Sequence, residues 1–254
     1  MAKSKTDKRE VTRIQQAIDK AIRMHDLLEE GDKITVGLSG GADSLVLLDT
    51  LAIRRKYFDV NYSLQAIHVN ITNIPYSVDR EYLENFCASR DVEFIWHDEE
   101  ITIDKNKVRS NLCFICSWNR RRILFQLAEK TGANKLALGH HKDDALETML
   151  MNMIFHGSIS SLPFRLKMFD GALTLIRPLL FLEKKDVELY AKIKNIEARV
   201  KTCPYATKTH RTKVWSVLEE MQKLNPKAKD KLFDSMSNIY QEYLPVKNKQ
   251  NDNN

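Results

Sequence analysis

The sequence lacks a long hydrophobic run, and this absence argues against a membrane-spanning protein. None of its apolar stretches approaches the ~20 residues that a transmembrane helix needs. Residues 1–13 are charged and have no apolar centre, so they do not predict a secretory signal. We therefore expect a protein of the reducing cytoplasm with no membrane partner.

Cysteine is scarce, but its spacing is informative. The chain has 4 cysteines, at Cys87, Cys113, Cys116 and Cys203. In a reducing compartment, cysteines tend to be free, metal-binding or catalytic rather than disulfide-bonded. Cys113 and Cys116 have the spacing of a pair that binds one soft metal centre or acts as a redox couple. Cys87 lies on the apolar face of a predicted helix, which indicates a core residue.

Three cysteines then remain for a metal centre. Thiolates from Cys113, Cys116 and Cys203 suit an iron–sulfur cluster with one open iron better than a structural zinc, which takes four protein ligands. Zinc stays an alternative if His210 supplies the fourth ligand. The other alternative is that the three cysteines are unrelated buried residues.

The charge balance is basic, with a formal net charge of +6. This balance favours a polyanionic partner, because lysine and arginine release counterions when they contact phosphates. Basic clusters at 120–122, 208–213 and 227–231 could hold an RNA backbone. Solvated helix faces are the alternative for these clusters.

Hydrophobic periodicity predicts strands that alternate with helices, which indicates βαβ units. We therefore predict an α/β fold, a doubly wound parallel sheet with helical extensions at both ends of the chain. The segment 173–180 fits either a strand or an extended crossing. A loop holds the Cys113–Cys116 pair before a helix that reaches about 129. The other expected strands are 33–38, 63–71, 92–96 and 135–139, and the other helices are 11–28, 42–54, 76–90, 143–155, 183–194 and 209–243.

The same pattern predicts the domain organisation. We expect a flexible arm at 1–10 and one nucleotide-binding domain at 11–205, which includes the cysteine loop. A C-terminal helical extension at 206–246 and a disordered tail at 247–254 follow.

Glycine is also sparse, at 8 residues, yet two glycines stand together between the first strand and the next helix. Gly40 and Gly41 let the backbone bend tightly and bring N–H groups close to an anion. Ser39 and Ser44 add hydroxyl donors, and the helix N-terminus attracts negative charge. Asp43 suggests Mg²⁺ between its carboxylate and phosphates, or a capping role. The alternative is an ordinary glycine-rich turn.

A second polar motif follows the strand at 135–139. It runs Gly139-His140-His141-Lys142-Asp143-Asp144 and opens a helix. Ligands of open parallel sheets bind beyond the carboxyl ends of the strands, where this motif and the glycine turn would both lie. The alternative for Asp143 and Asp144 is that their carboxylates only stabilise the N-terminus of the helix. The histidines fit metal or phosphate contacts as well as packing roles.

The turn at 39–44 resembles the PP-loop of N-type ATP pyrophosphatases and lacks the Gly-Lys-Ser/Thr ending of a Walker loop. With C-x-x-C before a basic helix start, L-G-H-H-x-D-D, I-R-P-L (176–179) and C-P-Y (203–205), the chain resembles the tRNA 2-thiolation enzymes. These pieces span about 34–205. Their combination is far more specific than any one of them.

The resemblance implies an ATP-dependent tRNA sulfurtransferase. AMP is transferred to the C2 oxygen of a tRNA pyrimidine, most simply a cytidine of the anticodon loop, and sulfur then replaces that oxygen. The implied cofactors are ATP, Mg²⁺ and a [4Fe-4S] cluster. The implied partners are tRNA and a sulfur donor, either a cysteine desulfurase or sulfide, with a homodimer as one possible assembly.

The resemblance also assigns site residues. Asp144 and Arg120 match residues tied to catalysis and ATP handling. The strand end 68–70 would flank the adenine and ribose. Cys113, Cys116 and Cys203 match the cluster ligands. The implied nucleotide-binding residues are Ser39, Gly40, Gly41, Asp43, Ser44, His68, Val69, Asn70 and Gly139.

Two departures refine this interpretation. Ala42 stands where these enzymes usually have lysine, which removes a cation from the phosphate site. The zinc-ribbon cysteines of some thiouridine enzymes are absent, which favours the shorter 2-thiocytidine type. The alternatives are a lysidine-synthetase type of adenylating enzyme, a non-catalytic ATP- or metal-binding RNA module, and a sulfur-handling enzyme acting on a small molecule.

Overall fold

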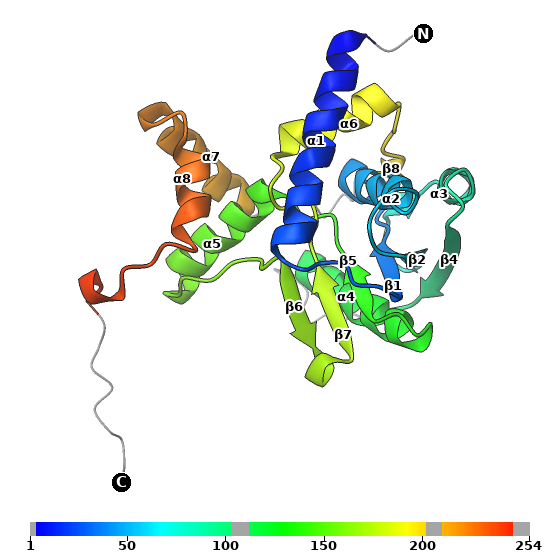
Figure 1. Ribbon diagram of the computed structural model, residues 1–254. Helices are drawn as coiled ribbons and strands as arrows, with labels where there is room; N and C mark the ends of the chain where they lie inside the picture. The colour runs from blue at the N-terminus through cyan, green and yellow to red at the C-terminus, as the bar shows by residue number, and fades with distance from the viewer. Residues whose placement is uncertain (1–3, 103–111, 202–209, 246–254) are drawn as a thin grey trace. The chain divides into compact units, whose positions relative to one another are not determined.

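The computed structural model describes residues 4–102, 112–201 and 210–245 (Figure 1). The chain forms two compact units. The first comprises Met1–Ala145 and Leu162–Thr209, and the second comprises Leu146–Ser161 and His210–Asn254. None of the described helices is both long and apolar enough to traverse a bilayer.

A six-stranded sheet forms the centre of the first unit, in the order β4-β2-β1-β5-β7-β6. All neighbouring strands pair in parallel except β6, which runs antiparallel to β7. The predicted α/β fold with a parallel sheet is therefore confirmed. The strands are β1 (Asp32–Gly37), β2 (Tyr62–Ile71), β4 (Glu93–Glu99), β5 (Lys135–Ala137), β6 (Arg165–Met168) and β7 (Leu173–Ile176).

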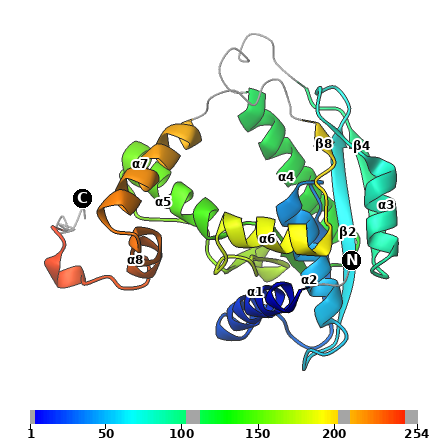
Figure 2. The same ribbon diagram turned by 90° about the horizontal axis from the view of Figure 1, so that it is seen from above.

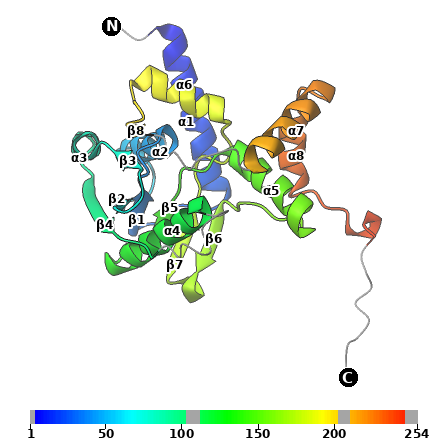
Figure 3. The ribbon, with the colours of Figure 1, turned by 180° about the vertical axis from the view of Figure 1, so that it is seen from behind.

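Successive side chains of a strand point to opposite faces of the sheet, so helices pack against both faces. On β2, Leu64 and Ala66 join the core formed with α1, α2, α3 and α6, whereas Ile67 and Val69 pack toward α4. Figure 2 shows α2 between α6 and the sheet, and Figure 3 shows α4 on the sheet's other face. These helices are α1 (Lys5–Met24), α2 (Ala42–Arg54), α3 (Arg80–Ala88), α4 (Leu112–Lys130) and α6 (Lys184–Lys194).

The N-terminal helix is longer at its start than predicted. Ser4 accepts a hydrogen bond from the N–H of Asp7, and Asp7 accepts one from the N–H of Ser4. This capping box begins α1 at Lys5, so residues 5–10, which we expected to form part of an arm, belong to the helix. The helix ends at Met24, before Asp26, whose φ is 47°.

Two predictions near the site are also corrected. α3 begins after Asp79, which caps it, rather than at 76. Ser77–Val78 instead form β3, which pairs antiparallel with β8 (Val200–Lys201). The cysteine pair lies in the first turns of α4, not in a loop before it.

The second unit is helical. The distal turns of α5 (Lys142–His156) pack with α7 (His210–Leu224) around Leu146, Met149 and Leu218. Because α5 begins in the first unit, the C-terminal helices share their core with its distal turns. The remaining elements are α8 (Ala228–Ser235), η1 (Phe169–Gly171) and η2 (Gln241–Tyr243).

Candidate active site

The turn at 39–44, which we call the phosphate loop, connects β1 to α2. Its serine hydroxyls hold the loop closed. The Ser44 hydroxyl accepts from the N–H of Ser39 at 3.1 Å and donates to the Gly41 carbonyl at 3.0 Å. Gly41 is the N-cap of α2 and provides no side-chain cap. The first-turn N–H groups of α2 therefore receive no side-chain cap and are available to an anion.

Gly40 allows the loop to pass beneath a two-stranded ribbon. Its φ is +83°, in the region that favours glycine. A Cβ atom at this position would lie 2.5 Å from Cγ1 of Val78 in β3 and 3.1 Å from Cγ2 of Val200 in β8. The β3–β8 pair therefore packs directly against the phosphate loop.

Gly139 brings the second polar motif against the phosphate loop. A Cβ atom here would lie 2.9 Å from the backbone C and O of Asp43 and 3.0 Å from the N of Ser44. β5 lies next to β1 in the sheet, so the two motifs meet at adjacent strand ends. The structure thus brings together the glycine turn and the acidic motif.

The two acids of the second motif have different surroundings. Asp143 is buried and accepts a hydrogen bond from the N–H of Lys184 at 2.6 Å, which ties the start of α6 to α5. Asp144 accepts from the N–H of His141 at 2.9 Å, and 26% of its side chain is exposed. Asp144 is the acid of the pair that can face a ligand.

Asp43 lies in the field of this motif. Burial raises the pKa of Asp43, the proximity of His141 lowers it, and the negative charge of Asp144 raises it. Two carboxylates that repel each other beside an open helix N-terminus form a suitable place for a cation bound to phosphates.

The end of β2 is more deeply buried than a simple adenine contact requires. His68 is 1% exposed, stacks on Trp96 at 4.5 Å between ring centroids, and contacts the Leu38 carbonyl through Nδ1 at 2.7 Å. Burial lowers the pKa of His68 to about 4. The ring is therefore neutral and positions the end of β1. Val69 is also buried, and Asn70 donates to Asp98 at 2.6 Å.

Arg120 reaches the phosphate loop through a residue that we did not predict. Its guanidinium lies 4.3 Å from the centroid of the Tyr76 ring, and the Tyr76 hydroxyl donates to the Ser39 carbonyl at 2.8 Å. Nε and Nη2 of Arg120 are buried and have no hydrogen-bond partner among the described residues. Tyr76 was missed because the sequence pattern placed it inside a helix.

The cysteines differ sharply in their surroundings. Cys113 is exposed and Cys116 half-buried, both on the first turns of α4, with Arg120 one turn after Cys116. Cys87 is fully buried, and burial raises the pKa of its thiol to about 12. The described part of the chain contains no set of three or more His, Cys, Asp or Glu side chains placed to hold a metal. Cys203 lies outside the described residues, so its predicted role as a cluster ligand stays a prediction.

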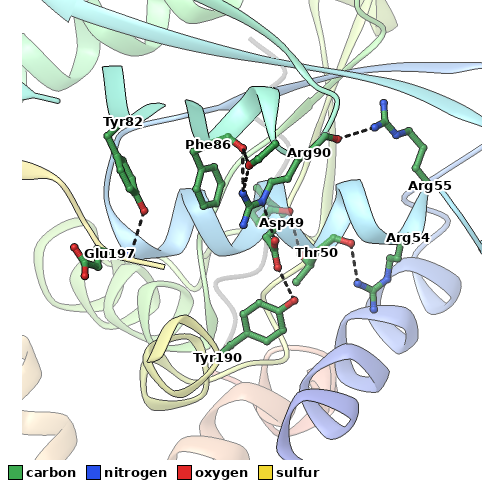
Figure 4. Close-up of polar contacts among 11 residues, drawn as sticks. Asp49, Thr50, Arg54, Arg55, Tyr82, Phe86, Arg90, Tyr190 and Glu197 are labelled. Atoms are coloured by element: carbon green, nitrogen blue, oxygen red, sulfur yellow. Dashed lines mark hydrogen bonds and ion pairs between the residues drawn. The ribbon is translucent and has the colours of Figure 1, made fainter. Parts of the chain in front are cut away.

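A buried polar network anchors α2, the helix that begins at the phosphate loop (Figure 4). Asp49 accepts from Arg90, just after the end of α3, and from the hydroxyl of Tyr190 of α6, each at 2.8 Å. Asp49 is 5% exposed. These bonds fix α2 between its two neighbours. Asp49 is an acid among the apolar residues of a predicted helix, and that position could have indicated a buried polar network.

Comparisons with known proteins agree with this site. The family model of the PP-loop domain matches residues 7–214. The chain is 34% identical over 237 residues to the tRNA-cytidine(32) 2-sulfurtransferase of Citrifermentans bemidjiense, covering 92% of both chains. It is 32% identical over 242 residues to the protein of the same name from Geobacter metallireducens, covering 94% of both.

A solved structure supports the same assignment. The chain matches the U34-tRNA thiolase NcsA from Methanococcus maripaludis, described with its [4Fe-4S] cluster, at a TM-score of 0.79 and 26% identity. The match covers 91% of this chain and 79% of that one. The resemblance expected from the motifs is thereby confirmed, and the chain belongs to the PP-loop family together with the tRNA-cytidine(32) 2-sulfurtransferases.

Proposed function

We propose that this protein is an ATP-dependent tRNA 2-sulfurtransferase that replaces the C2 oxygen of a cytidine in the anticodon loop with sulfur. The observation that carries this proposal is the convergence of three features in one region. They are an uncapped helix N-terminus at Gly41, the accessible Asp144 beside it, and Arg120 one turn from Cys116. The relatives with the same printed name support the choice of cytidine.

The phosphate loop would bind the pyrophosphate part of ATP. The first-turn N–H groups of α2 and the hydroxyl of Ser39 are donors, and Arg120 supplies a cation that compensates for Ala42 at the position where lysine is usual. Mg²⁺ would be held between the phosphates and Asp43, where the field of Asp144 favours positive charge. The strand end 68–70 would border the adenine and ribose.

The reaction needs a better leaving group than oxide on the cytosine ring. The C2 oxygen attacks the α-phosphorus of ATP, the bond to the pyrophosphate oxygen breaks, and pyrophosphate leaves. A sulfur nucleophile then adds at C2 and AMP leaves with the former carbonyl oxygen. Arg120 and the N–H groups of the loop would stabilise the charge that develops on the phosphates. Asp144 would orient the base or its proton.

Cys113, Cys116 and Cys203 would hold the iron–sulfur cluster. The described pair fits such a group, because both thiols lie on successive turns at the start of one helix and neither is in a disulfide. Cys87 does not fit, because burial raises its pKa to about 12 and disfavours the thiolate. When bound, a cluster with one open iron supplies sulfide or accepts it from the sulfur donor.

Cys203 follows β8 closely along the chain. It comes two residues after Lys201, the paired end of β8, and β8 packs against Gly40. This connection supports a common location for the three cysteines and the phosphate loop. A cytoplasmic protein with a cysteine desulfurase or free sulfide as its sulfur donor completes the proposal.

The test is anaerobic purification with iron and sulfide counts and a visible spectrum. Single turnover with ATP, sulfide and unmodified tRNA would then be followed by mass spectrometry of the nucleosides. Cys116→Ala should lose the broad absorption and the thiolated product, whereas Cys87→Ala should keep both. Colourless protein with stoichiometric zinc, or product formation without iron, would reject the cluster. Pyrophosphate release with total tRNA but no sulfur in the product would instead support the lysidine-type alternative.

A further inference from the structure

The carboxyl ends of β5 and β7 hold a group of basic side chains that the ATP site leaves unused. The two strands are neighbours, with Ala137 opposite Ile176. Arg177 follows β7 directly, and His140 follows the end of β5 by a few residues. Arg121, from α4, is next to Arg120 in sequence. These three residues belong to the same compact unit as the phosphate loop.

Arg177 is a buried cation that lacks a counter-ion among the described residues. It is 5% exposed and donates from Nη1 to the Pro163 carbonyl at 2.7 Å. Its buried Nε has no hydrogen-bond partner in the described part of the chain, and neither has Nδ1 of His140. Burying a polar group without a hydrogen-bond partner is unfavourable, and most of all for a charged guanidinium, so these atoms indicate a missing partner.

The charges of this group act on one another. Burial, together with the positive charge of Arg121, lowers the pKa of Arg177 to about 10. Burial also lowers the pKa of His140 to about 4; the negative charge of Asp144 opposes this, and the charges of Arg177 and Arg121 contribute to it. Two guanidinium groups therefore share one field with a neutral imidazole, an arrangement that an oxyanion relieves.

We propose that Arg177 and Arg121, together with His140, form a phosphate-binding site for the RNA substrate, separate from the loop that takes ATP. The site lies after β5 and β7, and the phosphate loop follows β1. β1 and β7 stand two strands apart, about 10 Å at the usual strand spacing. If ATP lies across the ends of β2 and β1, the end of β7 is left for the RNA. The inference rests on the proposed function, because that function makes the other reactant an RNA.

Guanidinium groups favour phosphate because their paired N–H donors match two phosphate oxygens. Every nucleotide of an RNA carries such a group. A phosphate held by Arg177 would place the neighbouring base toward Asp144 and the phosphate loop. The three residues would thus set which nucleotide of the loop enters the site.

The test measures binding and needs no turnover. The full-length protein would be titrated with an anticodon stem-loop RNA across a salt series, and separately with ATP. Arg121→Gln and Arg177→Gln should each weaken RNA binding about 10-fold and reduce the slope of log K against log salt by about 1. Their ATP affinities should stay at the wild-type value.

Arg23→Gln is the matched control, because Arg23 is exposed in the last turn of α1 and pairs with Asp59, which comes shortly before β2 and so lies at the opposite ends of the strands. It should retain RNA affinity. Arg177 is buried, so thermal melting would check the fold of its variant. Arg121 is exposed, and its variant alone can decide the question if the other fails to fold.

A second arm locates the phosphate. In RNAs that carry one neutral methylphosphonate at successive positions, one position should weaken binding to the wild type and have no effect on Arg121→Gln. Equal losses in both proteins at every position, or a loss confined to ATP affinity, would overturn the inference. Absence of any RNA binding by the wild type would instead count against the proposed function itself.

Discussion

At the scale of single residues, Gly139 sets how closely β5 can approach the start of α2. Its missing side chain lets the β5 end lie against the backbone of Asp43, where a Cβ would be 2.9 Å from the nearest atom. Backbone atoms cannot move aside as a flexible side chain can.

Gly139→Ala should therefore displace the phosphate loop. We expect a loss of about 1–3 kcal/mol in the free energy of unfolding and a larger proportional loss of ATP affinity. Denaturant unfolding and ATP titration would measure the two effects. Gly132→Ala is the control, because its φ is +73° but nothing lies within 4 Å of its Cβ position, so only backbone strain is added. Equal ATP affinity in both variants would contradict the close-approach argument.

His68 makes stability depend on pH. Burial lowers its pKa in the folded protein to about 4, below the value of about 6.5 in an unfolded chain. Between these values the unfolded state binds more protons, so stability is fully present above pH 6.5 and is lost as the pH falls toward 4. Burial lowers the pKa of His140 to about 4 as well, and burial lowers that of His25.

The free energy of unfolding should then fall between pH 6.5 and 4, by up to about 1.4 kcal/mol per pH unit for each such histidine. His68→Gln should reduce that slope. Urea unfolding at a series of pH values measures the slope. An unchanged slope in His68→Gln would show that the ring is not held neutral.

At the scale of helices and strands, the buried network of Figure 4 makes α2 depend on α3 and α6. Asp49→Ala removes the acceptor for Arg90 and Tyr190 and leaves two polar groups without their partner. The free energy of unfolding should fall by about 3–5 kcal/mol, as for other broken buried pairs.

Tyr190→Phe, which removes one hydroxyl, should cost about 1 kcal/mol, and the double variant should cost less than the sum. Additive losses in thermal or denaturant unfolding would mean that Asp49 and Tyr190 do not act as one network.

Helices and strands with a long run of regularly spaced apolar residues were predictable from the sequence, whereas very short paired strands were not. α2 was predicted at its observed bounds, because Gly41 precedes a continuous apolar helix. β3 and β8 have two residues each and exist only because they pair with each other across the fold. The antiparallel β6 was also missed, because it is only 4 residues long, although its polar and apolar residues alternate.

At the scale of the whole molecule, local motifs predicted which segments meet at the sheet edge, but not the long-range contacts that hold them in place. The glycine turn and the acidic motif share one sheet edge because parallel strands end there, a rule that needs no side-chain detail. The contacts of Tyr76 with the phosphate loop, and of Arg177 with a loop at Pro163, join segments far apart in sequence. No periodicity within one segment encodes such contacts. The role of Cys203 stays a prediction.

The ribbon above the phosphate loop has a mechanical consequence. Val200 rests within van der Waals reach of Gly40, and its strand leads straight into the stretch that carries Cys203. A loop that tightens around a triphosphate must push or draw this strand with it. Occupancy of the phosphate loop and the position of β8 are therefore coupled through this one contact.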